Sequence, residues 1–172
     1  MRITLAQTDI IWEDIRANLD SCSQLLSDFY GETDLILLPE LFTTGFTMKS
    51  RELAEPMGGK TMAWMKATAI HLKCNLVGSL IIEENGDFFN RLIWMQQDGR
   101  YFHYDKRHLF RMGGEEKHYS PGSSQLLVHS QGLRFRPQIC YDLRFPVWSR
   151  NRNDYDVLFY VANWPGQRRS VW

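Results

Sequence analysis

The sequence predicts a single α/β domain of the layered α+β kind, with a mixed sheet, over residues 1–172. Three observations support this prediction. Strand-like and helix-like segments alternate in the first half of the chain. A series of short strand-like segments, separated by turn signals, follows in the second half. A chain of 172 residues has the length of one domain and can bury a core without disulfides or metals.

The first half begins with a strand and a helix. Residues 2–9 alternate in the pattern of a strand, and residues 14–30 place apolar side chains three and four positions apart, as on one face of a helix. We place the stop signal of this helix at Gly31. The all-apolar residues 35–38 predict a strand that is buried on both faces, which Pro39 ends.

A second helix is expected at about residues 61–73, and strands joined by tight turns follow it. The turn signals are Asn85-Gly86, Asp98-Gly99 and Gln131-Gly132. The predicted strands are residues 75–82, 90–95, 101–105, 124–129, 133–140 and 157–161. A short helical turn is expected at residues 146–150.

Two segments depart from these simple patterns. Residues 107–123 have no clear period, and a loop of this length in a compact domain is usually functional. Pro137 lies in a strand that should be central, although proline cannot donate a hydrogen bond to a neighbouring strand. We therefore expect a bulge or an unpaired donor position at Pro137.

Charge and cysteine content disfavour several classes of protein. The 20 basic and 20 acidic residues give a net charge of zero, which argues against a nucleic-acid binder. No apolar stretch approaches the roughly 18 residues of a membrane span, and no apolar signal core follows Arg2, so we expect a cytoplasmic protein. Three cysteines without a CxxC pair and five scattered histidines predict no disulfide framework, no metal site and no cofactor.

Three chemically reactive residues stand at the ends of predicted strands. They are Glu40, Lys106 and Cys140. Side chains at one end of neighbouring strands converge in layered α/β proteins, and a thiol, a carboxylate and an ammonium together can perform acyl transfer. Each residue also has an ordinary interpretation: a buried cysteine, a loop carboxylate, and one charge in a solvated Asp-Lys-Arg run.

The local sequences around these residues resemble a known family. LLPELF (37–42), YDKRHLF (104–110) and ICYDLRFP (139–146) resemble, in order and spacing, the three signature segments of the nitrilase superfamily of carbon–nitrogen hydrolases. CYDLRFPVWSRN (140–151) and YVANWP (160–165) resemble the omega-amidase group, which hydrolyses the terminal amide of 2-oxo acid amides such as 2-oxoglutaramate. The resemblance covers the whole chain and implies a four-layer αββα sandwich.

The resemblance also implies a Cys-Glu-Lys triad. Cys140 is then the nucleophile, Glu40 the general base and Lys106 the group that stabilises the oxyanion. The family often has a further catalytic glutamate before a Pro-Gly turn. Glu115 fits this position best, with Glu116 as the alternative.

The implied reaction passes through a thioester. The charge of Lys106 is expected to favour the thiolate, and the backbone N–H of Tyr141 to share the oxyanion. A carboxylate on the substrate needs a cation, for which Arg144 is the first candidate and Arg168 the second. Arg144 could instead pair within the protein, for example with Asp142, or with a dimer neighbour.

The leading interpretation is an amidase that acts on small carboxylate-bearing amides and forms a homodimer, as proteins of the family commonly do. Two alternatives stay open: a hydrolase of nitriles, N-carbamoyl compounds or other linear amides, and a non-catalytic binding or assembly protein. Proteins of the family continue beyond the point that corresponds to the end of this chain. We therefore expect residues 1–172 to lack part of the sandwich, to associate, and to be weakly active alone.

Overall fold

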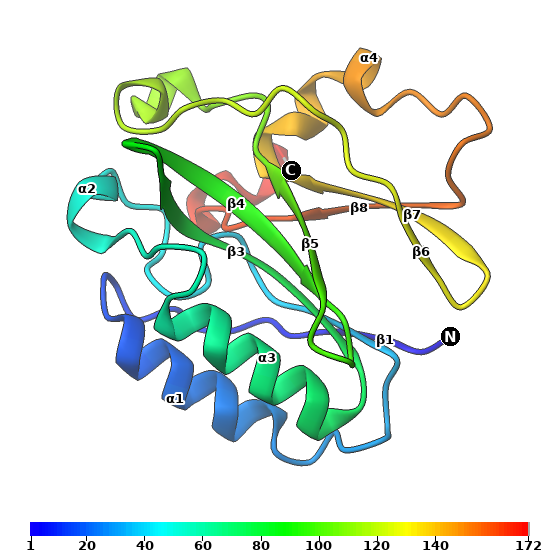
Figure 1. The fold of residues 1–172 in the computed structure, drawn as a ribbon. Coiled ribbons are helices and arrows are strands. Elements are labelled where there is room, and N and C mark those ends of the chain that lie inside the picture. Colours follow the sequence, from blue (N-terminus) through cyan, green and yellow to red (C-terminus); the bar gives the residue numbers. More distant parts are fainter. Residues whose placement is uncertain (172) are drawn as a thin grey trace.

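The computed structural model describes residues 1–171, with side chains up to residue 170. Its strands form two sheets (Figure 1). The larger sheet has the order β1-β2-β3-β4-β5; β1, β2 and β3 pair in parallel, whereas β3, β4 and β5 pair antiparallel. These strands are β1 (Ile3–Leu5), β2 (Leu35–Leu37), β3 (Asn75–Glu84), β4 (Asp87–Met95) and β5 (Tyr101–Asp105). The predicted mixed sheet is confirmed.

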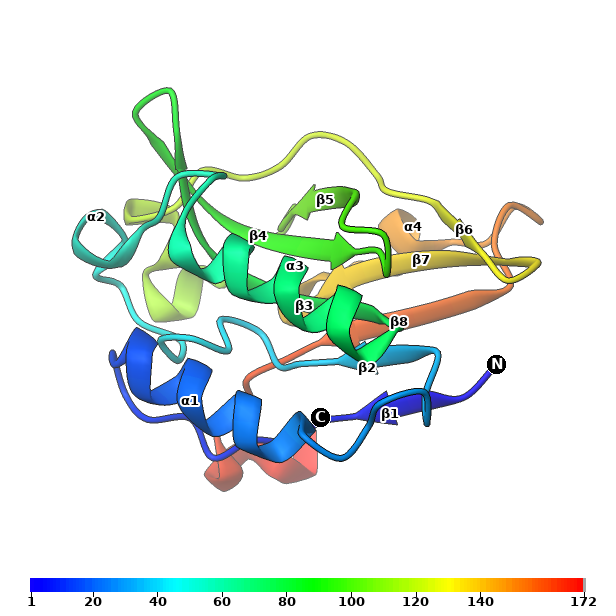
Figure 2. The ribbon, with the colours of Figure 1, turned by 60° about the horizontal axis from the view of Figure 1, so that its bottom comes forward.

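Two helices, α1 (Ile15–Leu26) and α3 (Lys60–Leu72), lie side by side against one face of the larger sheet (Figures 1 and 2). Asp14 caps α1 by accepting a hydrogen bond of 2.9 Å from the N–H of Ala17. The apolar faces of both helices pack with side chains of β2, β3 and β4 in one core. Burial of these faces orders the first two layers of the fold.

The second sheet packs on the opposite face of the larger sheet. It has the order β6-β7-β8, with β6 (Val128–Ser130), β7 (Leu133–Ile139) and β8 (Val157–Val161). The rings of Trp94 and Phe135 meet between the sheets, with centroids 5.2 Å apart. Residues 1–171 thus form the helix–sheet–sheet part of the expected αββα sandwich. Within these residues, no helix has the length and apolar character needed to cross a membrane.

Elements with strong local signals have the bounds that the sequence predicts. β5 and β8 match residue for residue, and α3 begins and ends one residue before the predicted limits. Asn85 and Gly86 have φ values of 55° and 86° and join β3 and β4 in the predicted hairpin.

The N-terminal strand and helix are shorter than predicted. The strand predicted over residues 2–9 ends at Leu5, because its partner β2 offers only three residues before Pro39. Helix α1 ends at Leu26 rather than at residue 30, because the chain continues there in i→i−3 turns. Gly31 lies in the following connection, with a φ of 68°.

The expected irregularity at Pro137 has a simple form. β7 pairs with β8 in an unbroken parallel register through Pro137 and Phe159. Of the two expected forms, the prediction of a bulge is therefore wrong. β6 pairs with β7 over Val128–Ser130, nearer the Gln131-Gly132 turn than the predicted residues 124–129, and this pairing stops at Phe135. Pro137 is therefore a donor-free position beyond the end of the β6 ladder.

Short helical segments complete the described chain. The sequence did not indicate α2 (Ser50–Leu53), whereas α4 (Pro146–Ser149) corresponds to the turn predicted at residues 146–150. The predicted long loop contains two 3-10 turns, η1 (Arg111–Gly113) and η2 (Glu115–Lys117). A third 3-10 turn, η3 (Cys140–Arg144), directly follows β7, and η4 (Gly166–Val171) ends the described chain.

Candidate active site

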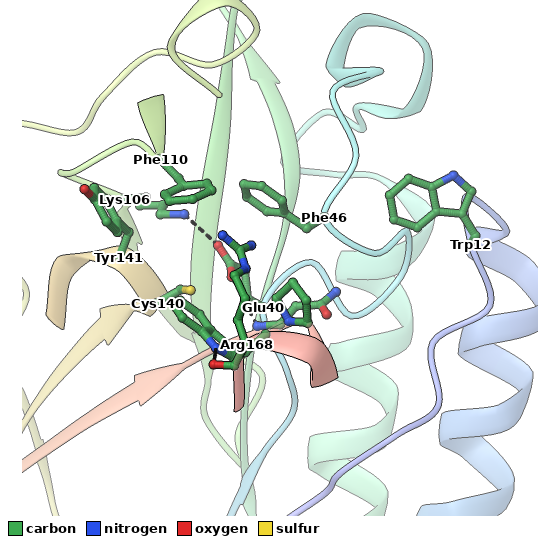
Figure 3. Close-up of a pocket in the computed structure, with 11 residues that line it drawn as sticks. Trp12, Glu40, Phe46, Lys106, Phe110, Cys140, Tyr141 and Arg168 are labelled. Atoms are coloured by element: carbon green, nitrogen blue, oxygen red, sulfur yellow. Dashed lines mark hydrogen bonds and ion pairs between the residues drawn. The ribbon is translucent and has the colours of Figure 1, made fainter. Parts of the chain in front are cut away.

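The candidate catalytic residues meet where four strands end. Glu40 follows β2, Lys106 follows β5, Cys140 follows β7 and Asn163 follows β8. All four line one cavity of about 260 Å³ (Figure 3). The structure therefore brings together the three residues that the sequence places at strand ends.

Glu40 has no exposed surface and is held from several directions. Its Oε1 accepts hydrogen bonds of 2.8 Å from both Lys106 Nζ and Asn90 Nδ2. Its Oε2 accepts a bond of 3.2 Å from the backbone N–H of Asn163, and Glu40 also hydrogen-bonds the thiol of Cys140. These contacts fix the carboxylate beside the sulfur.

Lys106 bridges Glu40 and a second carboxylate, Glu115. Its Nζ lies 3.0 Å from each carboxylate oxygen of Glu115. Burial alone would lower the pKa of Lys106, but Glu40 and Glu115 raise it overall, so the ammonium keeps its charge. Burial raises the pKa of Glu115, although Lys106 acts in the opposite direction.

Cys140 adopts an unusual backbone conformation at the start of η3. Its φ of 41° lies in the left-handed region, which costs a non-glycine residue about 1–2 kcal/mol. Burial and the charge of Glu40 raise the pKa of Cys140, while Lys106 lowers it and is outweighed. Lys106 thus acts toward the thiolate, as expected, but burial and Glu40 outweigh it and favour the thiol. Glu40, which accepts a hydrogen bond from this thiol, is the nearest candidate base.

The structure distinguishes the two candidate accessory glutamates. Glu115 is fully buried, contacts Lys106, and accepts a hydrogen bond of 2.5 Å from the N–H of Phe110. Glu116 follows it on η2 and is exposed. Glu115 is thus the second carboxylate of the buried cluster.

The two arginine candidates lie in different places. Arg168 lines the cavity, with its guanidinium carbon 5.3 Å from the centre of the Phe110 ring and 5.4 Å from that of Trp164. Arg144 is exposed and is not among the residues that line the cavity. The position at the cavity therefore favours Arg168, whereas Arg144, the first choice from the sequence, lies outside the cavity lining.

Five of the eleven residues that line the cavity are aromatic. The lining aromatic residues are Trp12, Phe46, Phe110, Tyr141 and Trp164. Tyr141 is the second residue of η3, and the first N–H groups of a helical turn have no partner within the turn. The backbone N–H of Tyr141, which follows Cys140 in the chain, stays the candidate oxyanion donor.

Sequence reasoning missed two asparagines in the cluster. Asn90 joins the two carboxylates, since its Nδ2 lies 2.8 Å from Glu40 Oε1 and 3.3 Å from Glu115 Oε1. Asn163 contributes its backbone N–H to Glu40. An asparagine within a predicted strand was the available sequence signal for Asn90. In the part of the chain that the structure describes, no group of three or more His, Cys, Asp or Glu side chains could hold a metal ion.

The chain is similar to several known proteins. A family model described as carbon-nitrogen hydrolase matches residues 2–172. The chain is 43% identical over 172 residues to the omega-amidase YafV of Yersinia enterocolitica, a match that covers 100% of this chain and 66% of that protein. It is 31% identical over 175 residues to the 2-oxoglutaramate amidase of Bacillus subtilis, covering 99% of this chain and 68% of that protein.

A solved structure has the same fold. It is XC1258 from Xanthomonas campestris, a CN-hydrolase superfamily protein with an arsenic adduct in the active site. The TM-score is 0.97 at 42% identity, and the match covers 100% of this chain and 68% of that one. The chain thus spans about two thirds of the length of the proteins that it matches.

Proposed function

Because the chain belongs to the carbon–nitrogen hydrolase family, we propose that it releases ammonia from the terminal amide of small 2-oxo acid amides such as 2-oxoglutaramate. The observation that carries the proposal is the buried contact of Cys140, Glu40 and Lys106 in a cavity that Arg168 also lines. The names of two similar proteins, an omega-amidase and a 2-oxoglutaramate amidase, support this substrate class.

The first half of the proposed reaction forms a thioester. Glu40 takes the proton of the Cys140 thiol while the sulfur attacks the amide carbon. Negative charge grows on the amide oxygen, where the ammonium of Lys106 and the backbone N–H of Tyr141 stabilise it. Glu40 then gives its proton to the amide nitrogen, so that the carbon–nitrogen bond breaks and ammonia leaves.

The second half hydrolyses the thioester. Glu40 takes a proton from water, the oxygen of the water attacks the thioester carbon, and the bond to sulfur breaks. The sulfur recovers a proton and the acid leaves. We propose that Glu115 keeps Lys106 charged and in place through both halves, since it contacts Nζ with both of its oxygens.

The position of Arg168 supports the proposal that the substrate carries a carboxylate. Its guanidinium is held against two aromatic rings at the cavity, and a guanidinium can bind a carboxylate with two parallel hydrogen bonds. Replacing Arg168 by Met should raise KM for 2-oxoglutaramate at least about tenfold, the loss of about 1.4 kcal/mol of binding, and change KM for an uncharged amide little. Equal effects on both substrates would give Arg168 a structural role.

The test of the proposed function is ammonia release from a panel of substrates. The panel contains 2-oxoglutaramate, an uncharged amide of similar length, a nitrile and an N-carbamoyl amino acid. The highest kcat/KM is expected for 2-oxoglutaramate. A preference for the nitrile or the carbamoyl compound would replace the substrate class, and no turnover together with no selective, substrate-protectable alkylation of Cys140 would indicate a non-catalytic protein.

A further inference from the structure

Asp142 is a buried carboxylate that lies outside the catalytic cluster. It has no exposed surface, and its two oxygens receive four hydrogen bonds. Oδ2 accepts from the hydroxyl of Tyr104 at 2.7 Å and from the N–H of Ile139 at 3.1 Å. Oδ1 accepts from the backbone N–H of His108 at 2.9 Å and lies 2.8 Å from Nδ1 of the same residue. A carboxylate can only accept, so Nδ1 of His108 carries a proton and donates.

These four bonds join the two segments that carry the reactive groups. Tyr104 and His108 stand two residues before and two residues after Lys106. Ile139 directly precedes Cys140, so its N–H fixes the start of the turn that holds the nucleophile. One side chain, Asp142, therefore ties the backbone around Lys106 to the backbone around Cys140.

The donors are themselves held in place. The ring of His108 is stacked on Phe145, with centroids 3.7 Å apart and an angle of 6° between the rings. The hydroxyl of Tyr104 accepts a hydrogen bond of 3.1 Å from the indole N–H of Trp148. Burial and the neighbouring Asp142 raise the pKa of Tyr104, so the phenol stays protonated and donates. The stacked ring and the two hydrogen bonds of the Tyr104 hydroxyl restrict how far these donors can turn away from Asp142.

The relative position of the proposed catalytic groups has to be fixed by contacts of this kind. Cys140 stays in a left-handed conformation, which persists only where surrounding contacts impose it. The carboxylate bond to the N–H of Ile139 is a contact of this kind. A shift of about 1 Å between reacting groups can reduce a rate about a hundredfold. The relative position of Lys106 and Cys140 therefore has to be set by groups other than the two residues themselves.

We propose that Asp142, Tyr104 and His108 form a positioning unit that sets the place of Lys106 relative to the sulfur of Cys140. None of the three lines the cavity, so the unit acts through the catalytic groups and not on the substrate. The proposal rests on the proposed function for its effect on turnover. Its effect on the reactivity of Cys140 is independent of which substrate the protein hydrolyses.

The experiment compares two substitutions of His108 in the full chain. His108→Leu removes the donor to Asp142, whereas His108→Asn restores one, because the amide nitrogen of asparagine takes nearly the place of Nδ1. The leucine variant should lose at least about tenfold in kcat with KM within twofold of the original value, and the asparagine variant should recover most of kcat. Alkylation of Cys140 by iodoacetamide, followed by mass spectrometry, should slow in the leucine variant and recover in the asparagine variant.

Tyr155→Phe provides the matched control. It removes a partly buried hydrogen bond of 2.5 Å to the carbonyl of Ser149, away from the cavity. This variant should lower the melting temperature and leave kcat and the alkylation of Cys140 unchanged. Equal kcat losses in both His108 variants, or unchanged alkylation in the leucine variant, would overturn the positioning unit. Recovery of alkylation in the asparagine variant without hydrolysis of 2-oxoglutaramate by the original chain would overturn the proposed substrate and support the positioning unit.

Discussion

The strands β4 and β5 carry a cluster of opposite charges on each of their two faces. Neighbouring residues of a strand point to opposite faces, so Asn90 and Arg91 separate, as do Asp105 and Lys106. Asn90 and Lys106 join the catalytic cluster around Glu40. Arg91 and Asp105 are directly paired in the sheet and form the second cluster on the other face.

The two clusters differ in how Arg91 contacts Asp105 and how Lys106 contacts Glu40. The guanidinium of Arg91 binds both oxygens of Asp105, at 2.6 Å and 2.9 Å, and reaches Glu84 at 3.0 Å. Lys106 contacts one oxygen of Glu40, and the same carboxylate also reaches the thiol of Cys140. The planar guanidinium of Arg91 occupies both oxygens of its carboxylate partner. The ammonium of Lys106 occupies one oxygen of Glu40 and leaves the other able to exchange a proton. The same strand pair thus positions a structural ion pair and the ion pair that we propose to be reactive.

The largest predicted effect is the loss of activity when the nucleophile beside the cluster of Glu40 is replaced. Cys140→Ser should abolish ammonia release, because a serine hydroxyl is a poor nucleophile beside a carboxylate base. Thioester trapping by hydroxylamine should disappear with it. The measurement is ammonia release under conditions where the variant melts cooperatively.

The other two cysteines provide controls for the nucleophile. Burial raises the pKa of Cys22 and of Cys74 to about 11. Both thiols are buried away from the cavity. Cys22→Ser and Cys74→Ser should therefore keep near-normal turnover. Loss of turnover in a folded Cys74→Ser variant would move the nucleophile away from Cys140.

The next largest effect should be the fall in kcat when Lys106, the proposed catalytic cation, is replaced. Lys106→Ala should lower kcat about 10²–10³-fold, the magnitude for loss of one oxyanion donor, with a smaller change in KM. Steady-state kinetics on 2-oxoglutaramate provide the measurement. Unchanged kcat with a raised KM would mean that Lys106 binds the ground state and not the transition state.

Replacement of Arg91, the structural cation, should lower stability and leave kcat nearly unchanged. Arg91→Met leaves Asp105, whose side chain is 17% exposed, without the group that binds both of its oxygens. The free energy of unfolding should fall by about 3 kcal/mol, as for a broken buried ion pair, and kcat of the folded fraction should stay within about twofold. Urea unfolding and ammonia release measure the two quantities. A fall in kcat as large as that of Lys106→Ala would end the distinction between the two clusters.

Local signals predicted most strands, and the resemblance of three sequence segments predicted the triad, but neither gave the whole cluster. β5 and β8 were predicted residue for residue because turns and charges bound their apolar runs on both sides. The N-terminal strand was predicted too long, because its length depends on β2, a partner some thirty residues away. The triad residues were accessible because the segments around them resemble the family's three signature segments, whereas their places at strand ends made them only candidates.

The rest of the site depends on contacts between distant segments. Asn90 and Asn163 reach Glu40 across separations of 50 and 123 residues, which no local pattern records. Arg168 was ranked below Arg144, since spacing along the chain does not say which side chain lies at the cavity. Glu115 and Glu116 could be distinguished only by the geometry of η2.

The smallest loss of stability should follow the removal of an exposed ion pair. This pair allows the buried clusters to be compared with one at the surface. Asp156 binds Arg134 near the start of β7 and β8 through the backbone N–H at 2.9 Å and through the guanidinium at 2.8 Å and 3.0 Å. These hydrogen bonds, first from the side chain and then from the backbone of Arg134, lower the pKa of Asp156 to about 2.

A carboxylate whose pKa is lower in the folded state stabilises the fold above its unfolded pKa of about 3.9. This contribution is lost as the pH falls through the folded pKa. Asp156→Asn should therefore lower the melting temperature at pH 7 by less than Arg91→Met does. The difference from the original chain should shrink between about pH 4 and pH 2 and on addition of about 1 M salt, which screens exposed pairs far more than buried ones. Melting curves across pH and salt test this, and a difference that stays constant in both would mean that the Asp156 pair behaves like the buried cluster of Arg91.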